Sequence, residues 1–117
     1  MFPVTRIYTD ANGDSRFEDL EISLIDAGEI GKLSERIPVS SLIFREVDAG
    51  YDYDFHNAPQ KQYLVLIDGG IEIETSLGEK RQFLPGQVLL LEDTDGKGHR
   101  TRNLEARLRR SVFITLP

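Results

Sequence analysis

Residues 50–75 read GYDYDFHNAPQKQYLVLIDGGIEIET, and this stretch decides the fold class. Two strand-like runs, 62–67 and 71–75, flank the turn signal Asp68-Gly69-Gly70. In the second run isoleucine alternates with glutamate, which is the period of two typical of a half-buried strand. An Asp-Gly-Gly turn between two such runs is typical of a β-hairpin. The stretch therefore predicts antiparallel strands and excludes a long helix.

Short strand-like runs and turn signals continue on both sides of this hairpin. Segment 26–36, with Gly28 and Gly31, is expected to be a loop with at most one short helical turn. No ten-residue helical period stands out. The expected strands lie at 4–9, 16–24, 39–47, 51–56, 80–84, 87–92, 99–103 and 107–116. This pattern predicts an all-β sandwich or barrel of about ten strands.

Composition narrows the class of protein. The chain has 117 residues, 14 Lys and Arg, 20 Asp and Glu, two His and no Cys, which suits one domain without disulfides or thiolate metal sites. The net charge of −6 argues against general nucleic-acid binding. No apolar run approaches the ~20 residues of a membrane span, and no secretory signal begins the sequence. We expect a cytoplasmic protein with neither nucleic acid nor membrane as a partner.

The charge is uneven along the chain. Residues 1–30 carry seven acids and two bases, whereas residues 97–110 carry six bases and one acid. The basic segment could form an anion or RNA patch. We favour the alternative, in which these bases point outward along two strands and face the acidic N-terminal strands.

Two further stretches show spacings that periodicity does not supply. The first runs from Gly50 through five residues to His56-Asn57-Ala58, then through three residues to Gln62 and six more to Gly69. This spacing resembles the first motif of the cupins, small β-barrels of two back-to-back sheets. The family's motif has Gly, His-x-His, Glu and Gly at these intervals.

The second stretch is Thr94-Asp95-Gly96, followed after two residues by His99 and after three more by Asn103. It resembles the second cupin motif, with Thr94 in place of a proline, and Gly78 and the Pro85-Gly86 turn resemble the earlier part of that motif. The resemblance implies a cupin-type double-stranded β-helix, or jelly-roll barrel, with an N-terminal hairpin. Residues 1–117 would form one cupin domain, with motif 1 at about 50–69 and motif 2 at about 78–103.

The resemblance also implies a site. Metal-binding cupins have His, His, Glu and His where this chain has His56, Ala58, Gln62 and His99. One possibility is that His56, Gln62 and His99 hold a divalent metal weakly, with Zn, Fe, Mn and Ni as the candidates. The other possibility is a branch of the family that has lost the metal and keeps the histidine pair in a polar pocket.

Strand geometry adds two residues to this pocket. Alternate side chains of a strand in a small barrel point inward, so Thr101 and Asn103 share the face of His99. A nearby acid could complete the site, and Asp54 and Glu92 are the candidates by position. The aromatic residues at 51, 53 and 55 are interpreted as one packed face of an edge strand.

Three functions remain open from the sequence. The chain could be a small enzyme that acts on a polar metabolite with a metal or by histidine acid–base chemistry. It could be a non-catalytic module that binds a small molecule, or a structural unit that only dimerises. The two histidines at ligand positions argue against the last alternative. We also expect a homodimer that covers the edge of the hairpin of residues 2–24.

Overall fold

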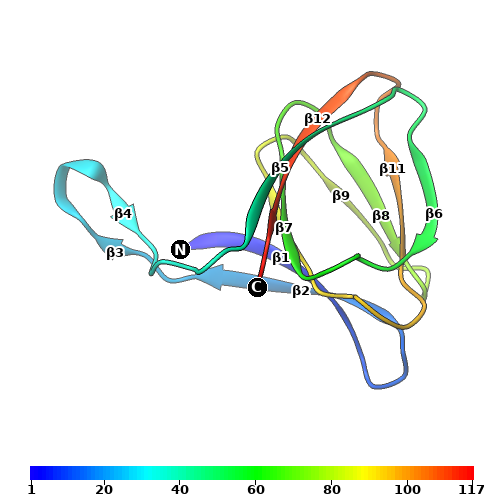
Figure 1. Cartoon of the computed structure of the whole chain (residues 1–117), viewed down its shortest axis with the longest axis horizontal. Helices are drawn as coiled ribbons and strands as arrows, with labels where there is room; N and C mark the ends of the chain where they lie inside the picture. The colour runs from blue at the N-terminus through cyan, green and yellow to red at the C-terminus, as the bar shows by residue number, and fades with distance from the viewer.

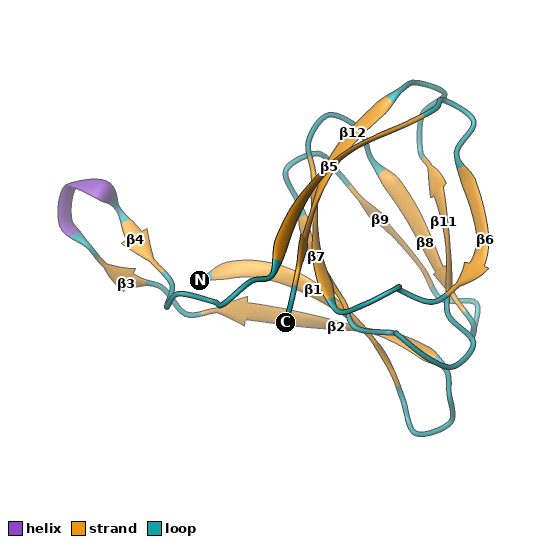
Figure 2. Cartoon of the chain, viewed as in Figure 1, coloured by secondary structure: helices purple, strands orange, loops and turns teal.

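A computed structural model describes all 117 residues, and almost all of the regular structure is strand (Figure 2). Two sheets face each other, and a thin arm extends from one side (Figure 1). The larger sheet has six strands in the order β2 (Ser15–Ile22), β1 (Phe2–Thr9), β10 (Val88–Leu91), β7 (Gln62–Leu66), β12 (Arg109–Thr115) and β5 (Ser41–Val47). The smaller sheet has four, in the order β6 (Asp52–His56), β11 (His99–Asn103), β8 (Ile71–Thr75) and β9 (Lys80–Phe83). The predicted all-β class is confirmed.

The two sheets do not close into a barrel, so of the two predicted arrangements, a sandwich or a barrel, the structure has two facing sheets. The jelly-roll barrel that the resemblance implies is not confirmed. The smaller sheet is antiparallel throughout, and the larger sheet is mixed because β1 pairs with β10 in parallel. The chain passes from one sheet to the other through turns that interrupt the ladder. At 84–87, for example, Pro85 has no N–H to donate and Gly86 takes a φ of 87°. The two sheets therefore end in separate edges.

The core lies between the two sheets, where the alternation predicts it. Leu64 and Leu66 of β7 face Ile71 and Ile73 of β8, and all four are at most 4% exposed. Glu72 and Glu74 of β8 lie on the other face, as a half-buried strand requires. This packing fixes which residues of each strand point into the space between the sheets.

The basic segment differs from its prediction. Lys97 does pair with Asp14 of the N-terminal hairpin, at 3.2 Å. The other paired bases of the segment meet acids elsewhere, in Arg100–Asp52, Arg102–Glu72 and Arg110–Glu46. Arg109 does not point outward at all, since it is 1% exposed. Strand alternation explains this, because Arg109 and Arg110 occupy opposite faces of β12.

The arm comprises residues 23–40, with β3 (Ile25–Asp26) and β4 (Lys32–Leu33) joined through a 3-10 turn at Gly28–Ile30. It projects away from the two sheets (Figure 1). Its apolar side chains are exposed, with Ile25 at 64%, Ile30 at 74% and Leu33 at 49%. A groove of about 390 Å³ runs between the arm and the outer face of the larger sheet. The short turn is the only helical element, and nothing in the structure could span a membrane as a helix.

Candidate functional site

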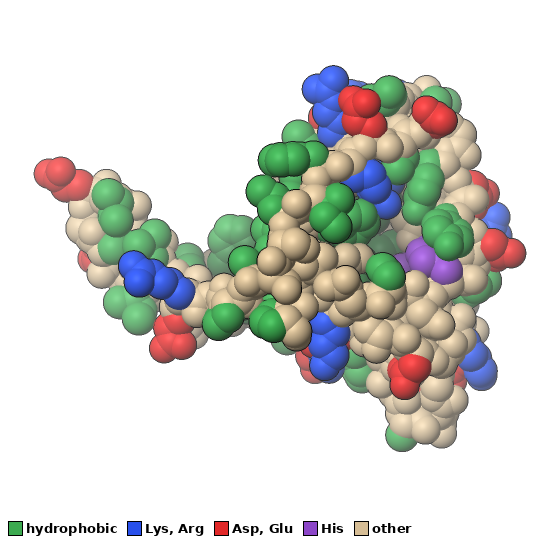
Figure 3. Space-filling model, in the orientation of Figure 1, with side chains coloured by type: hydrophobic (Ala, Val, Ile, Leu, Met, Phe, Trp, Pro, Cys, Tyr) green, Lys and Arg blue, Asp and Glu red, His purple; other side chains and the backbone are tan.

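A cavity of about 410 Å³ opens between the two sheets and contains both histidines on its wall. Figure 3 shows this hollow from its open side, with the histidines in purple at its edge. The strand registers place His56, His99 and Gln62 towards one end of this cavity and Arg45 and Tyr51 towards the other. Apolar side chains from both sheets lie between these ends. A cavity of this size and mixed lining suits a small organic molecule.

Five of the six residues predicted for the pocket line this cavity, namely His56, Ala58, Gln62, His99 and Thr101. Asn103 does not. It lies at the far end of β11, where its Nδ2 donates to the Asp48 carbonyl at 3.0 Å and its Oδ1 accepts from Arg109 Nε at 2.9 Å. Asn103 thus shares the inward face of His99 but holds a loop and an arginine instead of facing the cavity.

The two histidines lie opposite each other on neighbouring strands. His56 of β6 pairs with His99 of β11, and their ring centroids are 4.7 Å apart. Further along, Tyr53 pairs with Thr101, so three steps of β6 match two steps of β11. This β-bulge turns Tyr53 to the same side as His56, and the two rings stack at 3.8 Å. The interpretation of residues 51, 53 and 55 as one packed face was therefore wrong, because Phe55 falls within the bulge.

A buried carboxylate supports His99. Asp93 is 0% exposed, and its Oδ2 accepts hydrogen bonds from His99 Nδ1 at 2.5 Å and from Ser15 Oγ at 2.8 Å. His99 itself is 3% exposed. Because a carboxylate oxygen can only accept, a neutral His99 carries its proton on Nδ1 and donates it to Asp93. The other ring nitrogen, Nε2, then keeps its lone pair. The arrangement orients the ring and would stabilise a positive charge on it.

His56 is held in the same tautomer by the backbone. Its Nδ1 lies 2.7 Å from the Asp54 carbonyl oxygen, which can only accept, so Nδ1 carries the proton. Burial lowers the pKa of His56 below its usual value, and the nearby His99 acts in the same direction. His56 is therefore neutral at pH 7. Nε2 of each histidine is left without a partner in the protein.

The candidate acids from the sequence lie elsewhere. Glu92 forms ion pairs with Arg6 and Lys61 on the outside of the larger sheet. Asp54 contributes its backbone carbonyl, while its carboxylate accepts from the Phe55 amide at 2.8 Å. The acid that reaches the site is Asp93, the neighbour of Glu92. The position of Asp93, six residues before His99, could have marked it as a candidate. The direction of its side chain, however, depends on the loop of residues 92–98.

Gly98 brings that loop close to His56. It has a φ of +76°, and a Cβ on it would collide with the His56 carbonyl oxygen. Only glycine fits both this conformation and this approach. Gly98 thus sets the position of His99 relative to His56.

The residues present do not fit the four-ligand metal set that the resemblance implies. Two imidazoles on one tetrahedral ion, with bonds of about 2.1 Å, place their centroids about 5 Å apart, close to the observed spacing. However, Ala58 offers no ligand atom and Gln62 offers only a neutral amide. No three His, Cys, Asp or Glu side chains gather as a possible metal site anywhere in the structure. Weak metal binding at His56, Gln62 and His99 stays a prediction.

No family model matches this sequence, and no curated protein matches it. Among solved structures the chain is similar to protein NMB1881 from Neisseria meningitidis. The two share 15% sequence identity with a TM-score of 0.46, over 83% of this chain and 84% of that chain.

Proposed function

We propose that this chain is a small enzyme of the cupin fold that moves a proton on a polar metabolite held between its two sheets. The observation that carries the proposal is the buried Asp93–His99 pair, whose imidazole lines the cavity opposite neutral His56. A histidine backed by a buried carboxylate is a strong general base because the charge it gains is already compensated. No other group in the cavity has this arrangement.

The proposed step starts at His99. Its Nε2 takes the proton from a carbon next to a ligand carbonyl, and the electron pair moves onto the carbonyl oxygen. The imidazolium is stabilised by Asp93 and returns the proton to a carbon of the ligand. His56 accepts a hydrogen bond from a ligand hydroxyl through its Nε2, which orients the ligand. The step as proposed uses only these side chains and the ligand.

The cupin fold itself is part of the proposal. In support, motif-1 residues His56 and Gln62 begin and end a short connection from the smaller to the larger sheet, between β6 and β7. Motif-2 residue His99 begins the strand next to β6. The spacing of both motifs thus brings their histidines together, which is what such a fold requires.

Hydrogen–deuterium exchange tests the proposal across a range of candidate metabolites. The protein is incubated in D₂O with a panel of small hydroxy-ketones, keto-acids and sugars, and incorporation of deuterium next to the carbonyl is followed by NMR. We expect catalysed exchange for at least one compound, unchanged by EDTA and lost in His99→Gln. Exposed Asn12→Gln serves as the control and should keep the activity.

Two outcomes would contradict the proposal. If compounds raise the melting temperature but none exchanges, the chain is a binding module and not an enzyme. If exchange or binding requires added Zn²⁺ or Mn²⁺ and is abolished by EDTA, a metal performs the chemistry assigned here to His99.

A further inference from the structure

Two arginines lie inside the molecule without an acidic partner. Arg109 is 1% exposed, and Arg45 is half-buried on the wall of the cavity. Neither takes part in an ion pair, whereas six other arginines do, namely Arg6, Arg16, Arg81, Arg100, Arg102 and Arg110. Acids outnumber bases by 20 to 14, so the missing partners do not reflect a shortage of carboxylates.

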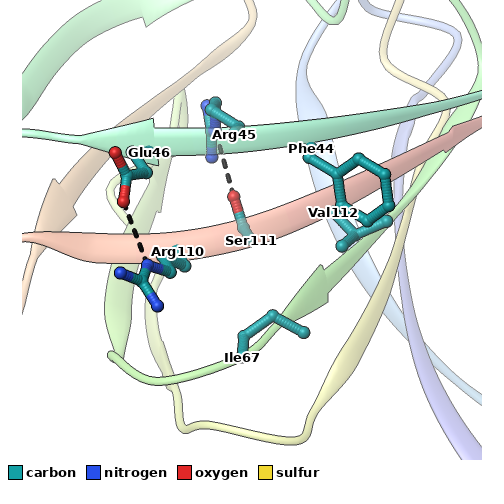
Figure 4. A pocket seen from close by; sticks show the side chains of 7 residues that line it. All are labelled: Phe44, Arg45, Glu46, Ile67, Arg110, Ser111 and Val112. Atoms are coloured by element: carbon teal, nitrogen blue, oxygen red, sulfur yellow. Dashed lines mark hydrogen bonds and ion pairs between the residues drawn. The ribbon is translucent and has the colours of Figure 1, made fainter.

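Each of the two guanidinium groups donates only one hydrogen bond to another side chain, through its Nε. Arg45 donates through Nε to Ser111 Oγ at 3.0 Å (Figure 4), and Arg109 donates through Nε to Asn103. Both terminal nitrogens of Arg109 are buried without a hydrogen-bond partner. Buried donors of a charged group are costly to leave unpaired. Of the two, only Arg45 lies on the cavity wall, so its free nitrogens are the ones that a ligand in the cavity can reach.

Aromatic rings bring the two guanidinium groups to one place. The Tyr51 ring has Arg45 Cζ at 5.7 Å and Arg109 Cζ at 5.4 Å from its centroid, and Phe113 has Arg45 Cζ at 4.4 Å. Burial lowers the pKa of Arg109 to about 10, and repulsion from Arg45 contributes to this shift. Burial also lowers the pKa of Arg45. Both remain cations at pH 7, so two positive charges without an ion-pair partner lie at this end of the cavity, Arg45 on its wall and Arg109 behind it.

The backbone is adapted to Arg109. A Cβ at Gly69 would lie 2.8 Å from Cγ of Arg109, so glycine at this position makes room for the arginine. A residue that only filled space would not need a charged head group here. The fold thus accommodates a buried cation at a place where no acid of the chain forms an ion pair with it, although the charge of Asp68 acts on it from a distance.

We propose that the end of the cavity at Arg45 binds the carboxylate of a small organic acid, with Arg109 as the second positive charge behind it. The planar fork of Arg45 pairs with a planar carboxylate through two parallel hydrogen bonds. The apolar walls cover the carbon skeleton, and the opposite end of the ligand reaches the histidines. This inference rests on the proposed function only for the orientation of the ligand. It names the substrate class as carboxylic acids.

The test compares three probes of similar shape by isothermal titration calorimetry and thermal unfolding. The probes are benzoate, its neutral counterpart benzamide, and phenyl phosphate. We expect benzoate to bind and raise the melting temperature, benzamide to do neither, and phenyl phosphate to bind more weakly than benzoate. Arg45→Gln should weaken benzoate binding by about 10- to 100-fold, the loss of a charge-assisted hydrogen bond. Arg107→Gln, which removes an exposed and unpaired arginine, should change nothing.

The ligand-free variants separate this role from a structural one. Removing an uncompensated charge should leave the melting temperature of Arg45→Gln equal to or above that of the parent protein. A fall of more than about 5 °C, roughly 1 kcal/mol, would show that Arg45 supports the fold and would overturn the inference. Equal binding of benzoate and benzamide, or tighter binding of phenyl phosphate, would also overturn it.

The two proposals can fail separately. If benzoate binding depends on Arg45 but no compound exchanges deuterium, the carboxylate site is supported and the proposed enzymatic function is contradicted. Deuterium exchange on neutral compounds only, with no binding of benzoate, would support the enzyme and contradict the carboxylate site.

Discussion

Replacing Ser15 with alanine tests the support behind the candidate base. Ser15 is 1% exposed, and its hydroxyl donates to the same oxygen of Asp93 that receives His99. The other oxygen, Oδ1, is buried without a partner. Alanine therefore leaves a buried carboxylate with only the hydrogen bond from His99.

The expected cost follows from this loss. A buried group deprived of a hydrogen bond costs about 1–3 kcal/mol, and more for a charged acceptor than for a neutral one. For a chain of 117 residues the entropy of unfolding is about 0.25 kcal/mol/K. We therefore expect Ser15→Ala to lower the melting temperature by about 4–12 °C. Deuterium exchange should slow as well, since the orientation of His99 depends on Asp93.

Urea unfolding of a double-mutant cycle with Asp93→Asn assigns the cost to this contact. We expect the two substitutions to be coupled by at least about 0.5 kcal/mol. Ser34→Ala is the matched control, because the Ser34 hydroxyl is exposed and bonds only to the adjacent Glu35 carbonyl. Its effect should stay within about 0.5 kcal/mol. A Ser15→Ala variant as stable as this control, with no coupling to Asp93, would refute the account of the buried pair.

Three further predictions concern pH, packing and assembly. Burial lowers the pKa of His56 in the folded state, so the unfolded chain takes up the proton at a higher pH than the folded chain does. The free energy of unfolding, measured in urea, should therefore fall as the pH drops below about 6.5 towards the folded pKa. This fall should be smaller in His56→Gln. Gly98→Ala should destabilise the protein by more than about 2 kcal/mol, since its Cβ would collide with the His56 carbonyl oxygen; an unchanged melting temperature would contradict the close approach. The arm has two-residue strands and exposed apolar side chains, so a second copy should cover it, and light scattering should give about twice 13.3 kDa. Ile30→Glu with Leu33→Glu should then give a monomer, while Glu29→Gln should remain a dimer; a monomeric parent protein would contradict this assembly.

The sequence predicted the strands well because each depends on local alternation. Segment 99–103 was predicted to the residue, and the loop at 26–36 does contain one helical turn, Gly28–Ile30. Closure of the barrel could not be predicted in this way. It depends on whether edge strands of different sheets meet, which no period of side chains encodes.

The site residues that lie at the ends of strands could be predicted from the sequence. The motif spacing and strand alternation place His56, Gln62 and His99 at one cavity. Asp93 was missed because its direction is set by a loop and by the approach of Gly98 to β6. The stacking of Tyr53 on His56 was missed because the bulge shifts the parity of β6 by one residue, and the pairing of one strand with another cannot be read from that strand alone.

The charges around the cavity connect these observations. In a cupin-type metal site, a carboxylate ligand faces the cation; here position 62 is a neutral amide, and the acid of the site lies behind His99, bonded to its Nδ1. Arg45 lines the opposite end of the same cavity, with Arg109 behind it, and neither guanidinium forms an ion pair. A divalent cation at the histidines would add two positive charges to a cavity that already has Arg45 on its wall and Arg109 behind it, and no carboxylate lines the cavity. An organic anion does the opposite, since it offsets the arginines and brings its own acceptors. The electrostatics of the cavity thus favour an acid over a metal ion, and the deuterium-exchange and benzoate experiments test the two halves of this argument independently.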